Sequence, residues 1–574
     1  MENARLARVF RDLAAYLEME GIRFKPRAYE KAAQALGAAL AIDVGERGAK
    51  GLREVAGIGA SMAQKLEELL TTGRCTVHEE YRTRLPVDIA GLTALEGIGP
   101  KAVRTLYETL GIRTVDDLAT AARGGKIRGL SSFGERSEQN ILRALSGAAS
   151  SGGRQLLAAV LPVVDDLARR LAVVPGVTQL VVAGSIRRRR ETIGDADLLG
   201  VARRPDALMD AFVGLPEVER VLGRGSTRSS VRLRSGFQID LRVVPAESLG
   251  AALLYFTGSK GHNVALRQLA IQKGLKLNEY GLFRGTRRIA GRTEAQVYER
   301  LGLPFVPPEL REDQGEIRAA LDGCLPRLIE HGTLRGDLQT QTDWTDGADS
   351  LEEMARAARD LGMQYVAITD HTVSLAMTGG SDAAKLRHQA AEIARLNARL
   401  DGIRILAGAE VNIMRDGTLD IDDDTLAALD VVGVAVHSHF RLSRAEQTAR
   451  IVRAMRNPHA DILFHPTGRI LQKREPCDVD LDAVIATACE TGTVLELDAY
   501  PERLDLRDEH LRRAVAAGIK LVIDSDAHNV RNLVYGERFG IDQARRGWVT
   551  AADVLNTRPL PDFLAALKGG AARR

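Results

Sequence analysis

The sequence has few cysteines and no long apolar run, and each absence excludes a class of protein. Its four cysteines are scattered along 574 residues without C-x-x-C spacing, so neither a disulfide framework nor a zinc knuckle is expected. No apolar run is long enough to span a bilayer, and the opening residues MENARLARVF lack a signal-peptide pattern. We therefore expect a cytoplasmic protein.

The length and the charge distribution predict several domains with two kinds of task. A chain of 574 residues is too long for one hydrophobic core, and typical domain sizes suggest roughly three to five domains. Residues 334–574 hold 30 Lys and Arg against 37 Asp and Glu, whereas the preceding 333 residues hold 49 against 39. Eight of the eleven histidines lie in the acidic part. A basic part suits a polyanion, and a part rich in His and Asp suits metal ions. Random drift of surface charge is the alternative.

Two segments of the basic part resemble each other: EVAGIGASMAQKLEEL at 54–69 and ALEGIGPKAVRTLYETL at 94–110. Each has an apolar helix end, a G-I-G turn and a second helix with apolar residues three or four apart. Such glycines allow a tight turn and leave backbone N–H groups available to a phosphate. The pair predicts helix-hairpin-helix DNA binding, with a looser third copy at 127–142, and an ordinary helical hairpin is the alternative. The candidate DNA-contacting residues here are Gly57, Gly59, Gly97, Gly99 and Lys101.

Paired aspartates follow in TQLVVAGSIRRRRETIGDADLLGVA at 178–202, where one apolar strand ends at a Gly-Ser pair and the next carries Asp195 and Asp197. Carboxylates two apart on a strand face the same way, and Asp240 of the apolar run FQIDLRVV is placed to complete the group. Three acids that hold two Mg²⁺ ions would activate a 3′-hydroxyl and neutralise a triphosphate. A solvated strand edge is the alternative. The candidates to hold the phosphates are Ser185 and Arg188.

The run GSIRRRRETIGDADLL resembles the nucleotidyltransferase signature of the family X DNA polymerases, and LLYFTGSKGHNVALRQLAIQKGLKLNEYGLF at 253–283 resembles their thumb segment. The resemblance covers about residues 1–315 and implies that the three aspartates bind Mg²⁺ or Mn²⁺. It implies that Tyr255 and Phe256 select the sugar, that Asn263 touches the minor groove and that Arg267 touches the template. For the two aromatic residues, core packing is the alternative. The implied nucleotide-binding residues are Gly184, Ser185, Arg188, Tyr255, Phe256, Gly258 and Asn263.

The N-terminal FKPRAYEKAAQAL at 24–36, with the first G-I-G segment, resembles the small lyase domain of DNA polymerase beta. In that domain a lysine amine forms a Schiff base with a 5′-deoxyribose phosphate. Lys65 occupies the matching position, with Tyr29 and Lys25 as matched helpers, whereas Ser61 stands where a second lysine is usual. A lysine that only binds a phosphate is the alternative.

After a boundary near residues 316–333, apolar strands alternate with helical patterns, and the strands end in ligand-type residues. Chemistry gathered at the C-terminal ends of successive strands is typical of a β/α barrel. A lone histidine at the end of a strand is more often structural than a ligand, but several converging imidazoles and carboxylates are costly unless they share a partner. The strand-end residues are Asp370, His371, Glu410, His437, His439, His465, Glu496, Asp498, Asp526 and His528.

This order resembles the polymerase-and-histidinol-phosphatase (PHP) domain over about residues 334–565, which implies a site for three Zn²⁺ or Mn²⁺ ions opened by an H-x-H pair. In GDLQTQTDWTDG at 336–347 that pair is Gln339 and Gln341 instead. Because an amide binds these ions less well than an imidazole, we expect fewer than three ions and weak Mn²⁺-dependent 3′→5′ exonuclease activity. A structural or DNA-positioning barrel is the alternative. The seven matching ligands are Asp346, His371, Glu410, His437, His465, Asp526 and His528.

The expected architecture is multidomain α/β. It comprises a lyase-like helical domain at 1–88, a fingers-type helical domain at 89–148, a palm with a mixed sheet at 149–245, a thumb at 246–318, a linker at 319–333 and a distorted TIM-like barrel at 334–574.

We expect a monomeric, nucleoid-associated polymerase that uses deoxynucleoside triphosphates to fill short gaps in DNA repair, on gapped or nicked DNA. The alternatives are a DNA-end nuclease with a vestigial polymerase, a DNA-binding scaffold and a template-independent transferase.

Overall fold

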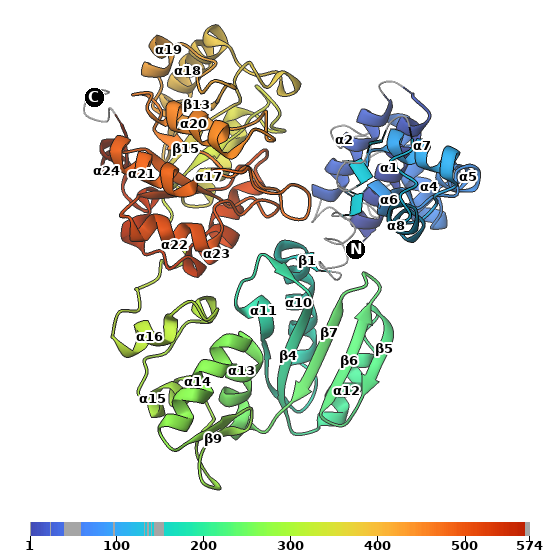
Figure 1. Cartoon of the computed structure of the whole chain (residues 1–574), viewed down its shortest axis with the longest axis vertical. Helices are drawn as coiled ribbons and strands as arrows, with labels where there is room; N and C mark the ends of the chain where they lie inside the picture. Colours follow the sequence, from blue (N-terminus) through green and yellow to red (C-terminus); the bar gives the residue numbers. More distant parts are fainter. Residues whose placement is uncertain are drawn as a thin grey trace. The chain divides into compact units, whose positions relative to one another are not determined.

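The computed structural model describes residues 2–22, 25–38, 59–93, 95, 98–130, 133–134, 137–138, 141–142 and 154–568. The chain forms two compact units, Met1–Gly152 and Gly153–Arg574. The first is blue to cyan in Figure 1 and the second runs from cyan to red. Among the described residues, no helix is both long enough and apolar enough to cross a membrane.

The first unit is helical and encloses two apolar cores. One core lies around Phe10 and Leu66, and the other lies around Leu106 and Leu118. The described helices are α1 (Glu2–Met19), α2 (Lys25–Ala38), α4 (Ala60–Thr72), α5 (Thr76–Arg84), α6 (Ile89–Thr93), α7 (Pro100–Leu110) and α8 (Val115–Arg123).

The two copies of the predicted repeat have matching helix boundaries. α4 and α7 each follow an extended glycine, Gly59 and Gly99, and each ends at a left-handed glycine, Gly73 and Gly111. A left-handed residue closes a helix at least cost when it has no Cβ atom. Gly57 and Gly97, and parts of the third copy at 127–142, lie outside the described residues.

The second unit begins with a palm built on a five-stranded mixed sheet. Its strand order is β2-β4-β7-β6-β5, with β4 parallel to β7 and the other neighbours antiparallel. Adjacent strand residues face opposite sides, so Leu198 joins the core under α10 and α12, while Leu199 packs with Leu249 of α13. The elements are β1 (Gln155–Leu156), α10 (Leu157–Ala172), β2 (Val177–Val182), α11 (Gly184–Arg187), β3 (Thr192–Ile193), β4 (Asp195–Ala202), α12 (Pro205–Val213), β5 (Val218–Arg224), β6 (Arg228–Leu233) and β7 (Gln238–Val243).

A thumb of helices and one small antiparallel sheet follows the palm. Its buried His262 contacts Glu316 through Nδ1 at 2.6 Å and the Tyr298 hydroxyl through Nε2 at 2.8 Å. This polar chain ties α14 to α15 and α16 across an otherwise apolar core. The elements are α13 (Leu249–Thr257), α14 (Lys260–Gln272), β8 (Lys276–Asn278), β9 (Gly281–Arg284), β10 (Arg287–Ala290), α15 (Glu294–Arg300) and α16 (Glu316–Leu321).

The remainder is a β/α barrel of seven parallel strands in sequence order, with helices around them (Figure 1). Every strand residue except Arg404 is buried, as expected of parallel strands covered on both faces. The ends of the sheet nearly meet, because Thr340 bridges to Ala527 just beyond the last strand. The strands are β11 (Gly336–Thr340), β12 (Tyr365–Ile368), β13 (Arg404–Asn412), β14 (Val431–Ala435), β15 (Ile462–Leu463), β16 (Val494–Asp498) and β17 (Leu521–Asp524). The helices are α17 (Leu351–Asp360), α18 (Ala383–Asn397), α19 (Asp423–Ala427), α20 (Arg444–Met455), α21 (Leu481–Thr491), α22 (Asp508–Ala516), α23 (Ile541–Arg546) and α24 (Leu560–Ala566).

Barrel packing leaves no room at Gly433 in β14, where a Cβ atom would lie 1.8 Å from the ring of Phe464. We expect Gly433→Ala to destabilise the barrel by roughly 1–3 kcal/mol, as overpacked cores do, measured as the urea midpoint of the full chain. Gly223→Ala in β5, where nothing lies within 4 Å, is the matched control. Equal midpoints for the two variants would contradict this packing.

Candidate functional site

Three aspartates lie together on the first residues of β4 and β7. Asp195 and Asp197 face the same side of β4, because the buried Ala196 between them faces the other side. The parallel register sets Asp240 of β7 directly opposite Asp197. The structure therefore brings together the three acids that were predicted to bind metal.

The charges of these acids oppose one another. Burial raises the pKa of Asp197 to about 6, and the carboxylates of Asp195 and Asp240 add to the shift, although Arg242 and Arg188 act against it. A divalent cation would relieve this repulsion, and carboxylate oxygens are the ligands that Mg²⁺ prefers. The three residues thus fit a divalent cation site.

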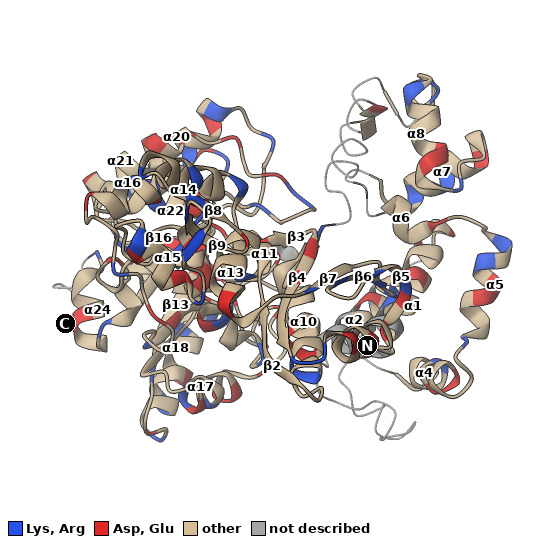
Figure 2. Ribbon diagram, turned by 90° about the horizontal axis from the view of Figure 1, so that it is seen from below, with Lys and Arg blue, Asp and Glu red and all other residues tan. Residues whose placement is uncertain are grey.

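Asp240 also has two polar neighbours. Arg228 of β6 lies 3.3 Å from one carboxylate oxygen, and the Gln238 amide donates to the other at 3.0 Å. Both residues line a surface groove along β5–β7 that also contains Arg224, and the basic positions of these strands are blue in Figure 2. A basic groove beside the three acids suits the phosphates of a nucleic acid strand.

Gly184 brings the backbone against the acids. It begins α11 with a φ of 66°, and a Cβ atom there would lie 2.8 Å from Asp197 Oδ2. A side chain at this position would therefore collide with the carboxylate as well as strain the backbone. The half-buried Ser185 follows it in α11.

Arg188, the predicted phosphate ligand, is paired within the protein. Its Nε donates to Glu312 Oε1 at 3.0 Å, and its Nη1 donates to the carbonyl oxygen of Thr257. Nη1 also limits the space at Gly258, where a Cβ atom would lie 3.2 Å away. The guanidinium thus lies between the palm and the YFTGS turn of the thumb.

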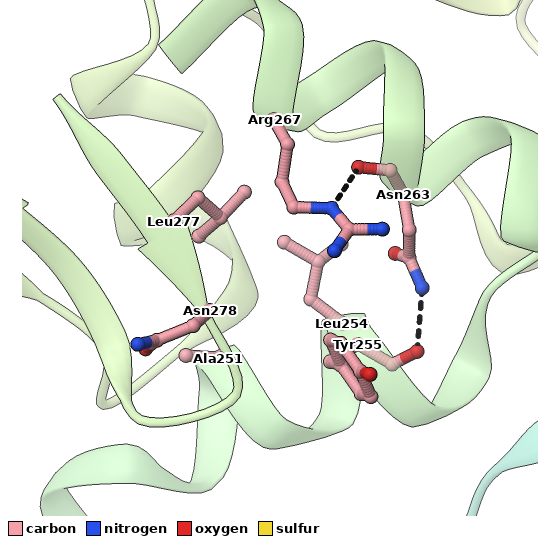
Figure 3. Close-up of a pocket in the computed structure, with 7 residues that line it drawn as sticks. All are labelled: Ala251, Leu254, Tyr255, Asn263, Arg267, Leu277 and Asn278. Atoms are coloured by element: carbon pink, nitrogen blue, oxygen red, sulfur yellow. Dashed lines mark hydrogen bonds between the residues drawn. The ribbon is translucent and has the colours of Figure 1, made fainter. Parts of the chain in front are cut away.

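One thumb pocket is lined by Tyr255, Asn263 and Arg267, which were predicted to contact the sugar, the minor groove and the template, whereas the second predicted sugar residue, Phe256, does not line it (Figure 3). Asn263 Nδ2 donates to the carbonyl oxygen of Tyr255 at 2.6 Å, and Arg267 Nε donates to that of Asn263 at 3.2 Å. Tyr255 is 37% exposed and stands edge-on to Phe256, whose ring packs under Arg242. Simple core packing therefore does not account for the exposed Tyr255, whereas Phe256 does pack within the protein.

The three residues of the predicted lyase site differ in their surroundings. Tyr29 is buried against Phe10 in the core of the first unit, whereas Lys25 is exposed. Lys65 is half-buried on α4, where its ammonium donates to the Ser61 hydroxyl at 2.9 Å. Lyase activity stays a prediction.

In the barrel, three imidazoles converge on the fully buried Glu410. His437 Nε2 and His465 Nε2 lie 2.9 and 2.8 Å from Oε1, and His371 Nδ1 lies 3.3 Å from Oε2. Burial alone would raise the pKa of Glu410, but these imidazoles hold that pKa well below its usual range. The ligand atoms of His371, Glu410 and His437 lie within 4.8 Å of one another, a spacing that fits a metal ion with nitrogen and oxygen ligands.

His371 also belongs to a second group with Asp346 and His528. Its Nε2 and that of His528 each lie 3.7 Å from an oxygen of Asp346. Burial lowers the pKa of His528, but the carboxylates of Asp526 and Asp346 raise it on balance. Asp526 itself is paired with Arg503, whose Nε lies 3.4 Å away. Five of the seven predicted ligands thus form two groups that share His371, and the other two, His465 and Asp526, contact Glu410 and His528.

Gln339 and Gln341 are fully buried beside these groups. Gln341 Nε2 donates to Glu410 Oε2 at 3.0 Å, so a hydrogen-bond donor faces the oxygen that a metal ion would use. Within the described part of the chain, three side-chain amide atoms lack a hydrogen-bond partner: Nε2 and Oε1 of Gln339 and Oε1 of Gln341. The amides fit a third transition-metal ion poorly.

Comparison with known proteins identifies the family of the chain. Family models match as a helix-hairpin-helix domain at residues 1–75, a SAM-like helix-hairpin-helix tandem at 89–146, a DNA polymerase beta thumb at 252–312 and a PHP domain at 337–535. The DNA polymerase/3'-5' exonuclease PolX of Bacillus subtilis (strain 168) is 37% identical over 99% of this chain and 100% of its own length. The chain belongs to the bacterial family X DNA polymerases.

Partial relatives match this family X chain over smaller shares. DNA polymerase lambda of Arabidopsis thaliana is 28% identical over 45% of the chain and 53% of its own length. A probable phosphatase of Thermoanaerobacter sp. (strain X514) is 30% identical over 31% of the chain and 72% of its own length. The predicted family and fold class are therefore confirmed.

Several residues at the sites of this family X polymerase were missed by sequence reasoning. Gln238 could have been found, because it lies two residues before Asp240 and so shares its face. Arg228 depends on the antiparallel register of β6 and β7, which the sequence does not specify. Asn412 and Arg503 contact predicted ligands in the barrel but stand outside the metal-ligand pattern.

Asn412 fixes the orientation of His437, because its Oδ1 lies 2.8 Å from Nδ1 while Nε2 faces Glu410. Losing such an orienting contact weakens metal affinity by roughly 10–100-fold. We expect that loss of Mn²⁺ affinity for Asn412→Ala in calorimetric titration. Asn397→Ala, which removes amide contacts to the backbone of Ile405, is the control. Unchanged affinity in Asn412→Ala would overturn this role.

Proposed function

We propose that this family X polymerase fills short gaps in DNA during repair, by adding deoxynucleotides to a primer 3′ end as a template directs. The observation that carries the proposal is the register that sets Asp197 opposite Asp240, with Asp195 on the same face. The full-length similarity to PolX of Bacillus subtilis supports it. The substrates would be gapped or nicked DNA and deoxynucleoside triphosphates, and we propose a monomer.

The palm residues would bind and orient the reactants. The three aspartates are proposed to hold two divalent cations, Mg²⁺ or Mn²⁺, whose chemistry is to activate the primer 3′-hydroxyl and neutralise the triphosphate. Gly184 would let Ser185 and Arg188 approach the phosphates, since no side chain stands between the backbone and Asp197.

The thumb residues would read the geometry of the new base pair. Tyr255, Phe256 and Gly258 are proposed to pack against the sugar. Asn263 would bond to minor-groove acceptors that all base pairs share, and Arg267 would contact the template strand. Outside the thumb, Gly59, Gly99 and Lys101 at the starts of α4 and α7 are proposed to hold DNA phosphates. The domain limits given above are proposed with these roles.

For the barrel we propose a weakened Mn²⁺-dependent 3′→5′ exonuclease that holds one or two Zn²⁺ or Mn²⁺ ions. The observation that favours this second activity is the convergence of three imidazoles on Glu410. The weakening is attributed to the buried amides of Gln339 and Gln341.

The polymerase proposal is tested by Asp197→Asn on DNA with a one-nucleotide gap and a 5′-labelled primer. Removing one carboxylate from the cation site should lower extension on the order of a hundredfold or more. Asp165→Asn, an exposed change on α10, should extend normally. A wild-type chain that binds the DNA but never extends it would favour the scaffold, and shortening without extension would favour the end nuclease.

The barrel proposal is tested by the double variant Gln339→His with Gln341→His. Because imidazole binds Mn²⁺ better than an amide, we expect about one more Mn²⁺ per chain by elemental analysis, and faster primer shortening without nucleotides. Glu410→Gln should lose bound Mn²⁺ in the same assay. The proposed cause fails if the double variant gains neither metal nor rate.

A further inference from the structure

Residues 187–191 of the palm form a charged run that is paired along its whole length. All five of its side chains are charged, and each contacts a partner in the thumb or the barrel. The run begins at the last residue of α11 and carries Arg188 of the proposed nucleotide site. Its conformation is therefore set by two other parts of the second unit.

The thumb engages the first two arginines. Arg187 Nη2 lies 2.6 Å from Glu294 Oε2, and its Nη1 donates to the Thr257 hydroxyl at 2.8 Å. Arg188 Nε donates to Glu312 Oε1 at 3.0 Å. These contacts join the run to the start of α15 and to the segment just before α16.

The barrel engages the rest of the run. Arg189, in a left-handed backbone conformation with a φ of 56°, lies 3.1 Å from Asp542 of α23. Glu191 accepts from Arg469 at 2.5 Å and from the Gln543 amide at 2.8 Å. Leu504 and Phe539 of the barrel also pack into the palm's own apolar core. The palm and the barrel thus share both a core and a polar contact surface.

Arg546 of α23 links both sides of this arrangement. It is 2% exposed. Its Nη1 donates to the backbone oxygen of Arg188 at 2.8 Å and to Glu312 Oε1 at 3.0 Å, and its Nη2 donates to Asp508. Glu312 Oε1 therefore accepts from both Arg188 and Arg546. The buried guanidinium of Arg546 thus neutralises part of the negative charge of Glu312.

We propose that the barrel is a structural part of the nucleotide site and that its Arg546 positions Arg188. This inference rests on the proposed polymerase function. Glu312 competes with an incoming triphosphate for the guanidinium of Arg188. Arg546 weakens that competition by sharing Glu312, and it fixes the backbone from which Arg188 reaches the phosphates. Without Arg546, the half-buried Glu312 would hold Arg188 more tightly, since a charge largely removed from solvent depends on its remaining partners.

The test is steady-state gap filling by the full chain, with KM for the nucleotide and kcat measured separately. We expect Arg546→Ala to raise KM about tenfold, in the range for loss of a charged hydrogen bond, with a smaller change in kcat. Arg546→Lys should lie between it and the wild type. Glu312→Gln combined with Arg546→Ala should recover most of the loss, because the competing charge is gone.

Arg545→Ala is the matched control. Arg545 is the neighbouring arginine of α23 and also reaches another part of the second unit, through Glu309 and the Ile329 carbonyl oxygen, each at 2.8 Å. Among the described residues, Arg545 has no hydrogen bond or ion pair with residues 187–191. The Arg545→Ala variant should have a lower melting temperature and an unchanged KM for the nucleotide. The inference is overturned if KM is unchanged in Arg546→Ala, or if both variants lose activity in parallel with stability. A wild-type chain that cannot extend a primer would instead refute the polymerase proposal.

Discussion

The need to compensate buried carboxylates is the constraint on which both sites of the second unit depend. In the palm, Asp197 has two like charges beside it and a raised pKa. In the barrel, burial raises the pKa values of Glu496 and Asp498, and neighbouring carboxylates add to each shift. Glu410 is equally buried, but the imidazoles around it hold its pKa low. A carboxylate that keeps its charge in such surroundings needs cations close by, either from side chains or from metal ions.

These clusters could be predicted from the sequence because two simple properties of strands are enough to find them. Side chains two apart share a face, which grouped Asp195 with Asp197, and parallel strands end at one edge, which grouped the barrel histidines with Glu410. The helix-hairpin-helix segments were predictable for a similar reason, since Gly59 and Gly99 occupy equivalent positions. Local pattern was sufficient wherever a site is repeated or regular.

Pairing across large sequence separations was not predictable. Arg188 was expected to bind phosphates. The structure shows in addition that Arg546, 358 residues away, donates to the backbone oxygen of Arg188. The run 187–191 looks from sequence like a solvated basic stretch for a polyanion, because its partners Glu294, Glu312 and Asp542 belong to other folded parts. Which of many acids neutralises a given arginine is decided by the packing of whole domains, and no short-range pattern encodes it.

The two tasks proposed for the barrel draw on different residues, so the loss of one would not require the loss of the other. The proposed metal ligands come from the C-terminal ends of the strands, whereas Asp542 and Arg546 come from α23 on the outer layer. Replacing imidazoles by amides at 339 and 341 leaves that helix untouched. One connection between the two sets lies in the loop that carries His465, because this loop also carries Arg469, which pairs with Glu191 of the palm. The loop therefore links a proposed metal ligand to the palm segment.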